Sequence, residues 1–235
     1  GVVAGGAMGG AAQLAARAAM RRAGYVAITG AKRIGPDALV NKRWDDVADD
    51  PRVGALLIGP GLGRDDKAHA ALSAALATPH PLVLDADALM LLTPQERDTL
   101  GDGGRRVILT PHEGEFAHLF GNLPGSKIDR ARAAAEMSGA VVILKGADTV
   151  IATPNGRVRM ALPAPGWLAS AGTGDVLAGL AVAALGSWTH FADVTLNAAC
   201  EAVWLHAEAA RLAGPALIAD DLPDLIPVAM AGCLA

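Results

Sequence analysis

The sequence has few aromatic residues, few cysteines and no large excess of charge of either sign. Aromatic residues make up 3% of the 235 residues, which argues against a stacking platform for single-stranded nucleic acid. The net charge of −4 gives no reason to expect a nucleic acid or an anionic membrane as a partner. The two cysteines, Cys200 and Cys233, lie far apart and lack the spacing of a zinc site or a disulfide framework. We interpret both as buried free thiols, which suits a reducing, cytoplasmic compartment.

We expect neither a membrane-spanning segment nor a signal peptide in this chain. Its most apolar stretch, residues 169–185, is interrupted by Asp175 and by glycines. Hydrophobic residues make up 52% of the chain and charged residues 19%, so a sizeable core is expected. No linker, repeat or low-complexity segment divides the sequence, so we expect residues 1–235 to form a single domain. The chain opens inside a predicted strand, so we also expect residues upstream of Gly1.

Short apolar runs alternate along the chain with alanine-rich stretches. The runs predict strands buried on both faces, over Val2–Ala4, Tyr25–Thr29, Ala55–Ile58, Leu82–Leu84, Val107–Leu109 and Val141–Leu144. The alanine-rich stretches predict helices over Ala11–Arg22, Asp66–Leu76, Gly114–Leu119, Ile128–Met137, Asp175–Leu185 and Ala192–Leu212. This alternation predicts an α/β fold with a mainly parallel central sheet and helices on both faces. The turn signal Pro154-Asn155-Gly156, between Thr149–Ala152 and Val158–Ala161, predicts an antiparallel hairpin at one edge.

The stretch from Ala171 to Asp175 is the most informative part of the chain. Gly172 and Gly174 allow a tight turn and a close approach to a ligand. The helix predicted to follow would point its unpaired N–H groups and the positive end of its dipole at that turn. Such a terminus favours an anion, and a phosphate is the usual one. Because Asp175 adds a carboxylate where a base would meet a phosphate acceptor, the stretch predicts phosphoryl transfer to a hydroxyl group.

Two further loops follow predicted strands, where ligands bind in sheets of this kind. The glycine-rich loop 59–63 could bring N–H groups against a phosphate or sugar, and it could equally be a tight structural turn. It has neither the Lys-Ser/Thr of a P-loop nor the spacing of a dinucleotide fingerprint. The two carboxylates of Asp85 and Asp87 could hold a metal-bound phosphate or a substrate hydroxyl, and Asp85 is closer to the strand end. We interpret its neighbour Asp87 as the cap of a short helix.

His112 and Lys145 follow two more predicted strands. His112 could exchange a hydrogen bond with a ligand, or its role could be structural. Lys145 could neutralise a nucleotide phosphate as a mobile point charge, or be a solvated lysine beside a turn. Glu113 and Glu115 suit the positive first turn of a helix, which is a sufficient structural reason for both. The remaining histidines have no metal-ligand spacing and are interpreted as surface or packed residues: His69, His80, His118, His190 and His206.

Five motifs, taken together, resemble one family. They are GPGLG (59–63), LDADAL (84–89), TPHEGE (110–115), LKGADTVI (144–151) and SAGTGDVLAG (170–179), in that order. The stretch from about Gly5 to about Leu212 resembles the ADP- or ATP-dependent NAD(P)H-hydrate dehydratases, which are ribokinase-like enzymes. GTGD alone marks the wider ribokinase-like superfamily, whereas TPHEGE combined with KGADT is much more specific. The resemblance therefore implies a ribokinase-like fold.

The resemblance also implies a reaction and roles for particular residues. Family members phosphorylate the C6 hydroxyl of hydrated NADH or NADPH with a nucleotide and then eliminate phosphate, which restores the cofactor. Asp175 would be the general base. An anion hole for the phosphoryl group would consist of the N–H groups of Ala171, Gly172, Thr173 and Gly174. The AMP part of the nucleotide would contact Lys145, Gly146, Ala147, Asp148, Thr149 and Gly174. The hydrated cofactor would contact Ala11, Gly61, His112 and Asp175.

Cofactors and partners are implied in the same way. Mg2+ is expected with the nucleotide, and no residue of the chain is assigned to the metal. Bacterial members generally use ADP and eukaryotic members ATP. The family often forms tetramers, so we expect a homo-oligomer. Many members carry an N-terminal epimerase domain, so a fused or separate epimerase is an expected partner.

Two other functions stay open at this stage. A ribokinase-like small-molecule kinase acting on a vitamin precursor or a sugar would share GTGD, but it does not predict TPHEGE with KGADT. A nucleotide-binding regulatory protein without catalysis would have no need of Asp175.

Overall fold

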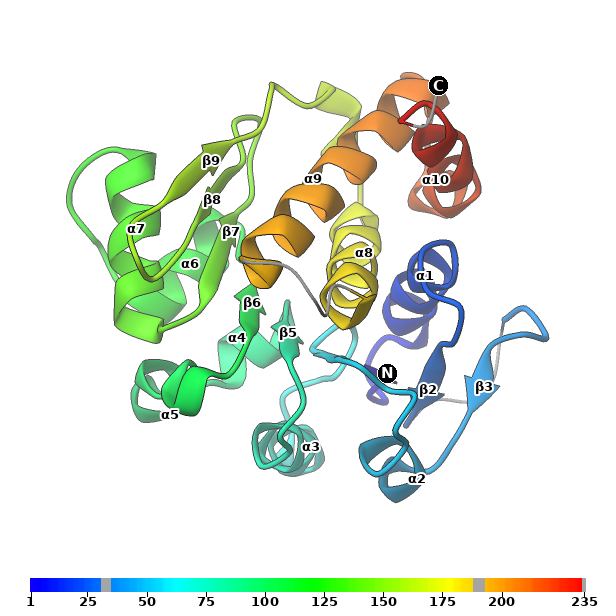
Figure 1. Cartoon of the computed structure of the whole chain (residues 1–235), viewed down its shortest axis with the longest axis horizontal. Helices are drawn as coiled ribbons and strands as arrows, with labels where there is room; N and C mark the ends of the chain where they lie inside the picture. Colours follow the sequence, from blue (N-terminus) through cyan, green and yellow to red (C-terminus); the bar gives the residue numbers. More distant parts are fainter. Residues whose placement is uncertain (31–34, 188–192, 234–235) are drawn as a thin grey trace.

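The computed structural model describes residues 1–30, 35–187 and 193–233, and these are built around one nine-stranded sheet (Figure 1). The strands lie in the order β3-β2-β1-β4-β5-β6-β7-β8-β9. Their bounds are β1 (Val2–Val3), β2 (Ala27–Thr29), β3 (Val40–Asn41), β4 (Leu56–Ile58), β5 (Leu82–Leu84), β6 (Val107–Leu109), β7 (Val141–Leu144), β8 (Val150–Ala152) and β9 (Val158–Met160). Pairing is parallel from β3 across to β7 and antiparallel for β7–β8 and β8–β9. The predicted mainly parallel sheet with an antiparallel edge hairpin is confirmed.

Helices cover both faces of this sheet, as predicted (Figure 1). One face carries α1 (Gly9–Met20), α8 (Thr173–Ser187), α9 (Val194–Ala213) and α10 (Leu222–Ala231). The other carries α2 (Trp44–Ala48), α3 (Asp66–Leu76), α4 (Asp87–Leu91), α5 (Pro94–Asp98), α6 (Glu113–Phe120) and α7 (Lys127–Ser138). Three short 3-10 helices complete the described elements: η1 (Asp102–Gly104), η2 (Gly166–Leu168) and η3 (Ala219–Asp221).

The central strands are buried on both sides because successive side chains point to opposite faces of the sheet. In β4, Leu57 packs into the cluster under α1 and α8, whereas Leu56 and Ile58 pack into the cluster under the other helices. The same alternation holds in β5, where Val83 joins the first cluster and Leu82 and Leu84 the second. This explains why these strands are continuous apolar runs in the sequence.

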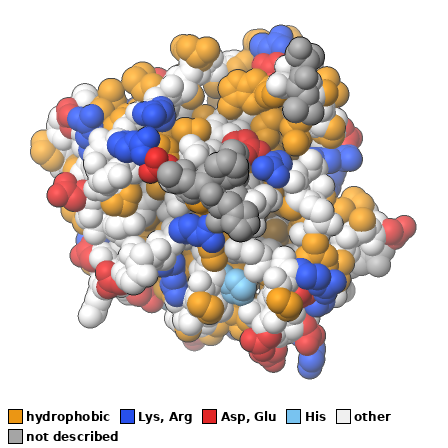
Figure 2. Space-filling view, viewed as in Figure 1, with side chains coloured by type: hydrophobic (Ala, Val, Ile, Leu, Met, Phe, Trp, Pro, Cys, Tyr) orange, Lys and Arg blue, Asp and Glu red, His pale blue; other side chains and the backbone are white. Residues whose placement is uncertain are grey.

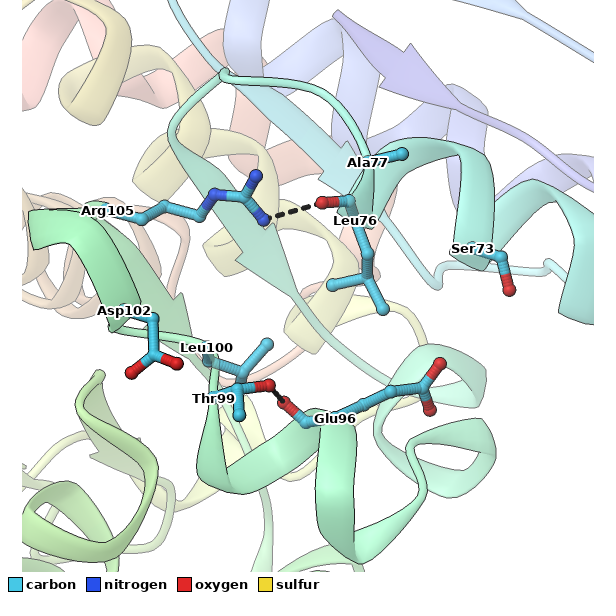
Figure 3. Close-up of a pocket in the computed structure, with 8 residues that line it drawn as sticks. All are labelled: Ser73, Leu76, Ala77, Glu96, Thr99, Leu100, Asp102 and Arg105. Carbon is cyan, nitrogen blue, oxygen red and sulfur yellow. Dashed lines mark hydrogen bonds between the residues drawn. The ribbon is translucent and has the colours of Figure 1, made fainter.

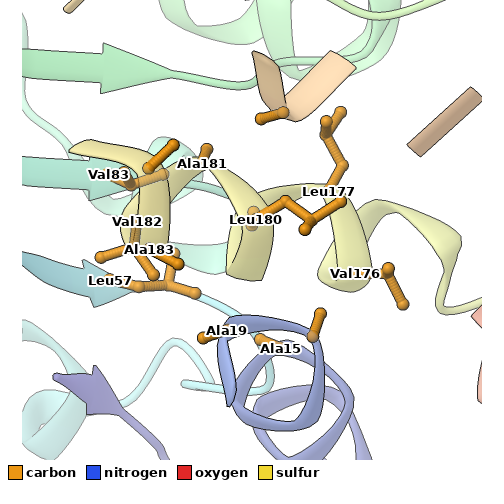
Figure 4. Close-up of a cluster of buried hydrophobic side chains, with 14 of the residues drawn as sticks. Ala15, Ala19, Leu57, Val83, Val176, Leu177, Leu180, Ala181, Val182 and Ala183 are labelled. Atoms are coloured by element: carbon orange, nitrogen blue, oxygen red, sulfur yellow. The ribbon is translucent and has the colours of Figure 1, made fainter. Parts of the chain in front are cut away.

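Helix α8 lies between α1, α9 and the sheet, and it is buried all round (Figure 4). Its approach to α1 is close because Gly179 has no side chain: a Cβ there would lie 2.1 Å from the backbone oxygen of Ala15. Ala15 and Ala19 present only methyl groups on the facing side of α1, which Figure 4 shows beneath α8. This packing fixes where the amino terminus of α8 points.

Several elements differ from the sequence prediction. Helices α2, α5 and α10 and strand β3 were not predicted, because the first two and the strand are too short to show a period. In α10, Pro223 lies in the first turn, where proline is tolerated, whereas Pro227 lies inside the helix, where a proline usually breaks it, yet the helix continues to Ala231. Helices α1 and α8 begin two residues earlier than predicted, at Gly9 and Thr173. The predicted start of α9, Ala192, lies outside the described residues.

The prediction that both cysteines are buried is wrong for one of them. Cys200 is half-buried in α9, but Cys233 is exposed because α10 ends at Ala231 and leaves it beyond the last turn. Both thiols are free. Across the described part of the chain, every helix is too short or too polar to cross a membrane. The face in view in Figure 2 carries acidic and basic side chains interspersed among hydrophobic ones.

Candidate active site

The turn before α8 is held by its own hydrogen bonds. Thr173 Oγ1 donates to the backbone oxygens of Leu168 (2.7 Å) and Ser170 (2.9 Å). Gly172 has a φ of +87°, a conformation that favours glycine. The Gly172 carbonyl accepts from the N–H groups of Asp175 (3.1 Å) and Val176 (3.3 Å). Because Gly174 lies in the first turn, its N–H has no partner within the helix and is available to an anion.

Asp175 lies in this first turn and is largely buried. Burial raises the pKa of its carboxyl to about 7, the charges of Asp85 and Glu115 act in the same direction, and Lys145 opposes them. A carboxyl group with a pKa near neutrality is suited to general base catalysis, because it can both take and release a proton at physiological pH. The position and the pKa agree with the predicted role of Asp175.

Asp85 is completely enclosed at the carboxyl end of β5. Its Oδ1 accepts from Thr110 Oγ1 (2.7 Å) and from Lys145 Nζ (2.9 Å). The register explains the first contact: Leu84 pairs with Leu109, so Asp85 and Thr110 are the next residues on adjacent strands. Asp85 is therefore an internal partner of Lys145 in this structure.

Lys145 is not the mobile point charge that the sequence suggested. Its ammonium lies 2.9 Å from Asp85 and 3.7 Å from Glu115 Oε2, and its side chain is mostly buried. Burial alone would lower the pKa of Lys145, but Asp85 and Glu115 reverse this and raise it. A Cβ placed on Gly174 would lie 3.5 Å from the Lys145 ammonium. The cation is thus fixed beside the turn at the start of α8.

His112 is the N-cap residue of α6. Its Nδ1 accepts from the N–H groups of Gly114 (3.0 Å) and Glu115 (3.1 Å), while Glu115 Oε2 accepts from the His112 N–H (2.8 Å). With Nδ1 occupied as an acceptor, the neutral ring carries its proton on Nε2. The side chain is 61% exposed, and its Nε2 lies 3.5 Å from Glu115 Oε1, so this N–H is near Glu115 and is also open to a ligand. Both readings of His112 from the sequence, structural and ligand-binding, are compatible with this geometry.

The Lys145–Thr149 stretch forms a compact turn after β7. Thr149 Oγ1 donates to the Gly146 carbonyl (2.9 Å) and accepts from the Gly146 N–H (3.3 Å). Asp148 is paired with Lys127 of α7 at 2.7 Å. The turn therefore presents backbone groups of Gly146 and Ala147 beside a cavity, with its polar side chains already engaged.

A cavity of about 520 Å3 brings most of the predicted nucleotide residues together. It is lined by Lys145, Gly146, Ala147, Thr149, Thr173 and Gly174, and also by His112. Apolar side chains from α8 and α9, Leu177 and Val203, line another side. Of the predicted site residues, Ala11, Gly61, Asp148, Ala171, Gly172 and Asp175 are not part of this lining.

Ala11 and Gly61 lie together in a second group. The segment before α1 packs against the glycine-rich loop, where the Gly61 carbonyl accepts from the Met8 N–H at 3.4 Å. Gly61 has a φ of +64°, and a Cβ there would lie 2.1 Å from the Met8 oxygen. Ala11 donates to the same Met8 oxygen at 3.2 Å. The loop is thus a tight turn that also places the two predicted substrate residues on either side of Met8.

The interpretation of Asp87 as a helix cap is wrong. Ala86 is the N-cap residue of α4, whereas Asp87 Oδ2 accepts from the Gly63 N–H at 2.9 Å and Oδ1 pairs with Arg64 at 2.9 Å. Asp87 therefore fixes the glycine-rich loop instead of the helix. The sequence could not show this, because the partners lie more than twenty residues away.

Three residues near the site were missed or given another role. Glu115 is buried and faces Lys145, although its place in a helix first turn was a sufficient reason for it in the sequence. Thr110 anchors Asp85. His206 lines the cavity, and its Nε2 is buried with no hydrogen-bond partner. Burial lowers the pKa of His206 to about 4. The residue interpreted as packed is thus a neutral imidazole beside the site, while His190 lies outside the described residues.

A second cavity, of about 430 Å3, lies away from these residues (Figure 3). It is bordered by α3, α5 and Arg105, which precedes β6, so it lies toward the amino end of that strand. Arg105 donates to the Leu76 oxygen at 2.8 Å, and Thr99 to the Glu96 oxygen at 3.2 Å. In open α/β sheets ligands bind at the carboxyl ends of strands, so the cavity beside α8 is the candidate active site.

The fold is ribokinase-like, and the site combines a glycine-containing turn at the start of α8 with a largely buried carboxyl group, that of Asp175. A ribokinase-like protein of Enterococcus faecalis shares the fold, with a TM-score of 0.78 over 98% of this chain and 86% of that one, at 22% identity. The profile of the NAD(P)H-hydrate dehydratase family matches residues 1–227. The chain belongs to this family.

Individual relatives agree with this assignment. The chain is 42% identical over 157 residues to the bifunctional NAD(P)H-hydrate repair enzyme Nnr of Mycobacterium tuberculosis, covering 64% of this chain and 33% of that protein. It is 37% identical over 173 residues to the ADP-dependent (S)-NAD(P)H-hydrate dehydratase of Neisseria meningitidis, covering 71% of this chain and 57% of that protein. The ADP/ATP-dependent dehydratase of Bacillus subtilis, co-crystallised with ATP and Mg2+, superposes with a TM-score of 0.83 at 31% identity, covering 98% and 88% of the two chains. The match thus spans about a third of the length of the bifunctional relatives.

Proposed function

We propose that this protein is a nucleotide-dependent dehydratase that returns hydrated NADH or NADPH to the intact cofactor. The observation that carries the proposal is the position of Asp175, a mostly buried carboxyl beside a cavity of about 520 Å3 that contains the KGADT turn and His112. A kinase acting on other small molecules would share the base and the turn. The two motifs that meet in this cavity are those specific to the family.

The proposed first step is phosphoryl transfer to the C6 hydroxyl of the hydrated nicotinamide. Asp175 accepts the hydroxyl proton as the oxygen attacks the terminal phosphorus of ADP, and AMP leaves. The N–H groups of Ala171, Gly172 and Gly174 and the positive end of the α8 dipole stabilise the charge on the phosphoryl oxygens, whereas the Thr173 N–H donates to the Ser170 carbonyl at 3.4 Å. Lys145, held beside Gly174, adds a fixed positive charge.

The proposed second step is elimination. Phosphate is a better leaving group than hydroxide, so the C6–O bond breaks with loss of phosphate and of a ring proton, and the ring double bond returns. In the proposed binding mode the hydrated ring lies near Ala11, Gly61 and His112, whose Nε2–H can donate to the substrate. The AMP part lies along the Lys145–Thr149 turn, beside the apolar wall of the cavity.

Magnesium is proposed to enter on the nucleotide. Residues 1–30, 35–187 and 193–233 contain no group of three or more histidine, cysteine or acidic side chains placed to hold a metal. Mg2+ commonly binds through nucleotide phosphates while keeping several waters, so this proposal needs no donor set on the protein. No step of the proposed reaction is assigned to a protein-bound metal.

Three further properties of the protein are proposed, each on its own grounds. An epimerase, fused or separate, is proposed as a partner because the M. tuberculosis relative is bifunctional. A homo-oligomer is proposed from the family resemblance. The free thiols of Cys200 and Cys233 favour a reducing, cytoplasmic compartment.

The nucleotide and the reaction are tested in one assay. The protein is incubated with hydrated NADH or NADPH, Mg2+ and either ADP or ATP, and recovery of the absorbance of the reduced cofactor is followed. We expect recovery with ADP to be faster than with ATP. No recovery with either nucleotide would contradict the proposal, and a stable phosphorylated product without elimination would identify a small-molecule kinase instead.

The pH dependence of this reaction is predicted from Asp175. The base must be ionised to accept a proton, and its pKa is raised to about 7. We therefore expect kcat/KM to rise about tenfold per pH unit below pH 7 and to level off above it. A profile that is flat between pH 5.5 and 8 would show that Asp175 does not act as the base at its free-enzyme pKa.

A further inference from the structure

The ionisable groups beneath the α8 turn form one connected cluster. Adjacent strands bring them together: Asp85 follows β5, Thr110 follows β6 and Lys145 follows β7. Lys145 reaches across β6 to Asp85 at 2.9 Å, and Glu115 of α6 lies on its other side at 3.7 Å. One ammonium is therefore shared by two buried carboxylates before any ligand is present.

We propose that Asp85 and Glu115 are positioning residues that hold the Lys145 ammonium against the turn at the start of α8, and that the charges of this cluster act on the Asp175 carboxylate in addition to its burial. This inference rests on the proposed function, because it concerns the base of that reaction. It assigns Asp85 a role inside the protein instead of a contact with a metal-bound phosphate or a substrate hydroxyl.

The geometry favours the internal role for Asp85. Its side chain is 2% exposed, so it has almost no surface to offer a ligand. Its Oδ1 already accepts from both Thr110 and Lys145. A buried carboxylate is stable only when it is paired and hydrogen-bonded, and these two contacts supply both conditions.

The cluster acts on Asp175 with opposing signs. The negative charges of Asp85 and Glu115 raise the pKa of Asp175, in addition to the effect of burial, and the positive charge of Lys145 lowers it. Two carboxylates and one cation leave one negative charge in the cluster, so the base holds its proton more tightly than an exposed aspartate would. Nucleotide phosphates that pair with Lys145 would bring further negative charge and make Asp175 hold its proton still more tightly.

Among the described residues, the side chains named next from α9 and α1 add no unpaired charge to this cluster. Helix α9 contributes His206, which burial keeps neutral by lowering its pKa to about 4. Helix α1 contributes Arg17, paired with Asp220 at 2.7 Å, and Arg21, paired with Asp224. Leu14 of α1 faces Gly172 with an apolar side chain.

The test is a direct titration of Asp175 that needs no substrate. The protein is labelled with 13C at the aspartate carboxyl carbons, and the Asp175 signal is assigned by its loss in Asp175→Asn. We expect the midpoint of Asp175 to fall by about one pH unit in Asp85→Asn and to rise by about one in Lys145→Met. Thr110→Val, which removes a hydrogen bond to Asp85 without changing any charge, serves as the matched control and should shift the midpoint by less than about 0.3.

Opposite shifts of the Asp175 midpoint in Asp85→Asn and Lys145→Met would support the proposed role of the cluster. If the two variants only loosened the structure around Asp175, the direction of the shift would not depend on the sign of the charge removed. Midpoints that stay within about 0.3 unit of the parent in both would overturn it. Lower affinity for Mg2+–ADP in Asp85→Asn with an unmoved titration would also overturn it, in favour of a ligand contact. If Asp85→Asn does not fold, Glu115→Gln removes the second carboxylate and must lower the midpoint. If hydrate turnover were absent, the proposed function would fail while the titration still reported on the cluster.

Discussion

Asp175→Asn is expected to lower turnover by about 10^2–10^4-fold while leaving nucleotide binding within about threefold of the parent. The amide keeps the size of the side chain and the packing of the first turn of α8, but it cannot take a proton. The loss should therefore appear in kcat, and the Kd for Mg2+–ADP measured by calorimetry should change little. Asp66→Asn, an exposed first-turn carboxylate on α3, is the matched control and should turn over like the parent.

The same variant should be more stable than the parent at high pH. The folded protein holds the Asp175 proton up to about pH 7, whereas the unfolded chain releases it near pH 3.8, the ordinary pKa of an aspartate. Stability from this group is therefore lost as the pH rises between these values. We expect Asp175→Asn to be about 1–3 kcal/mol more stable than the parent at pH 8 in urea unfolding, and nearly equal to it at pH 4. Equal stabilities at both pH values, together with retained turnover, would show that Asp175 is neither buried in this way nor the base.

Gly179→Ala is expected to destabilise the protein by about 2–3 kcal/mol, a fall in Tm of about 5–10 °C. The added Cβ would lie 2.1 Å from the Ala15 backbone oxygen, so α1 and α8 must move apart. Ala15 cannot yield by changing a rotamer, because the contact is with its backbone. The separation would also loosen the core to which α8 contributes Val176 and Leu180 (Figure 4).

The control for this prediction is the same substitution at a helical glycine with open space. Gly10→Ala, in the first turn of α1, meets nothing within 4 Å. Alanine restricts the unfolded chain and favours the helix, so this variant should be more stable than the parent by about 0.5–1 kcal/mol. Thermal unfolding of both variants at one pH measures whether each substitution lowers or raises the stability. A stabilising effect of Gly179→Ala would mean that the α1–α8 contact is wider than described.

The fold was largely predictable from the sequence because its signals are local. The buried strands are continuous apolar runs, and the Pro154-Asn155-Gly156 turn marks the edge hairpin; both patterns need only neighbouring residues. The elements that escaped prediction have weak local signals. Strand β3 has two residues, and α10 continues past Pro227 because its apolar side packs into the core with Leu222 and Ile226.

By itself the sequence determined the α/β class, the family and the turn that precedes α8, because glycine spacing and motif order depend only on the order of residues along the chain. Tertiary structure alone decided which charges meet. Asp85, Glu115 and Lys145 come from segments up to sixty residues apart, and only the parallel strand order brings them beneath Asp175. Burial there turned Lys145 from a mobile cation into a fixed one and raised the pKa of Asp175. Desolvation and charge pairing depend on distances in three dimensions, which a residue pattern does not contain.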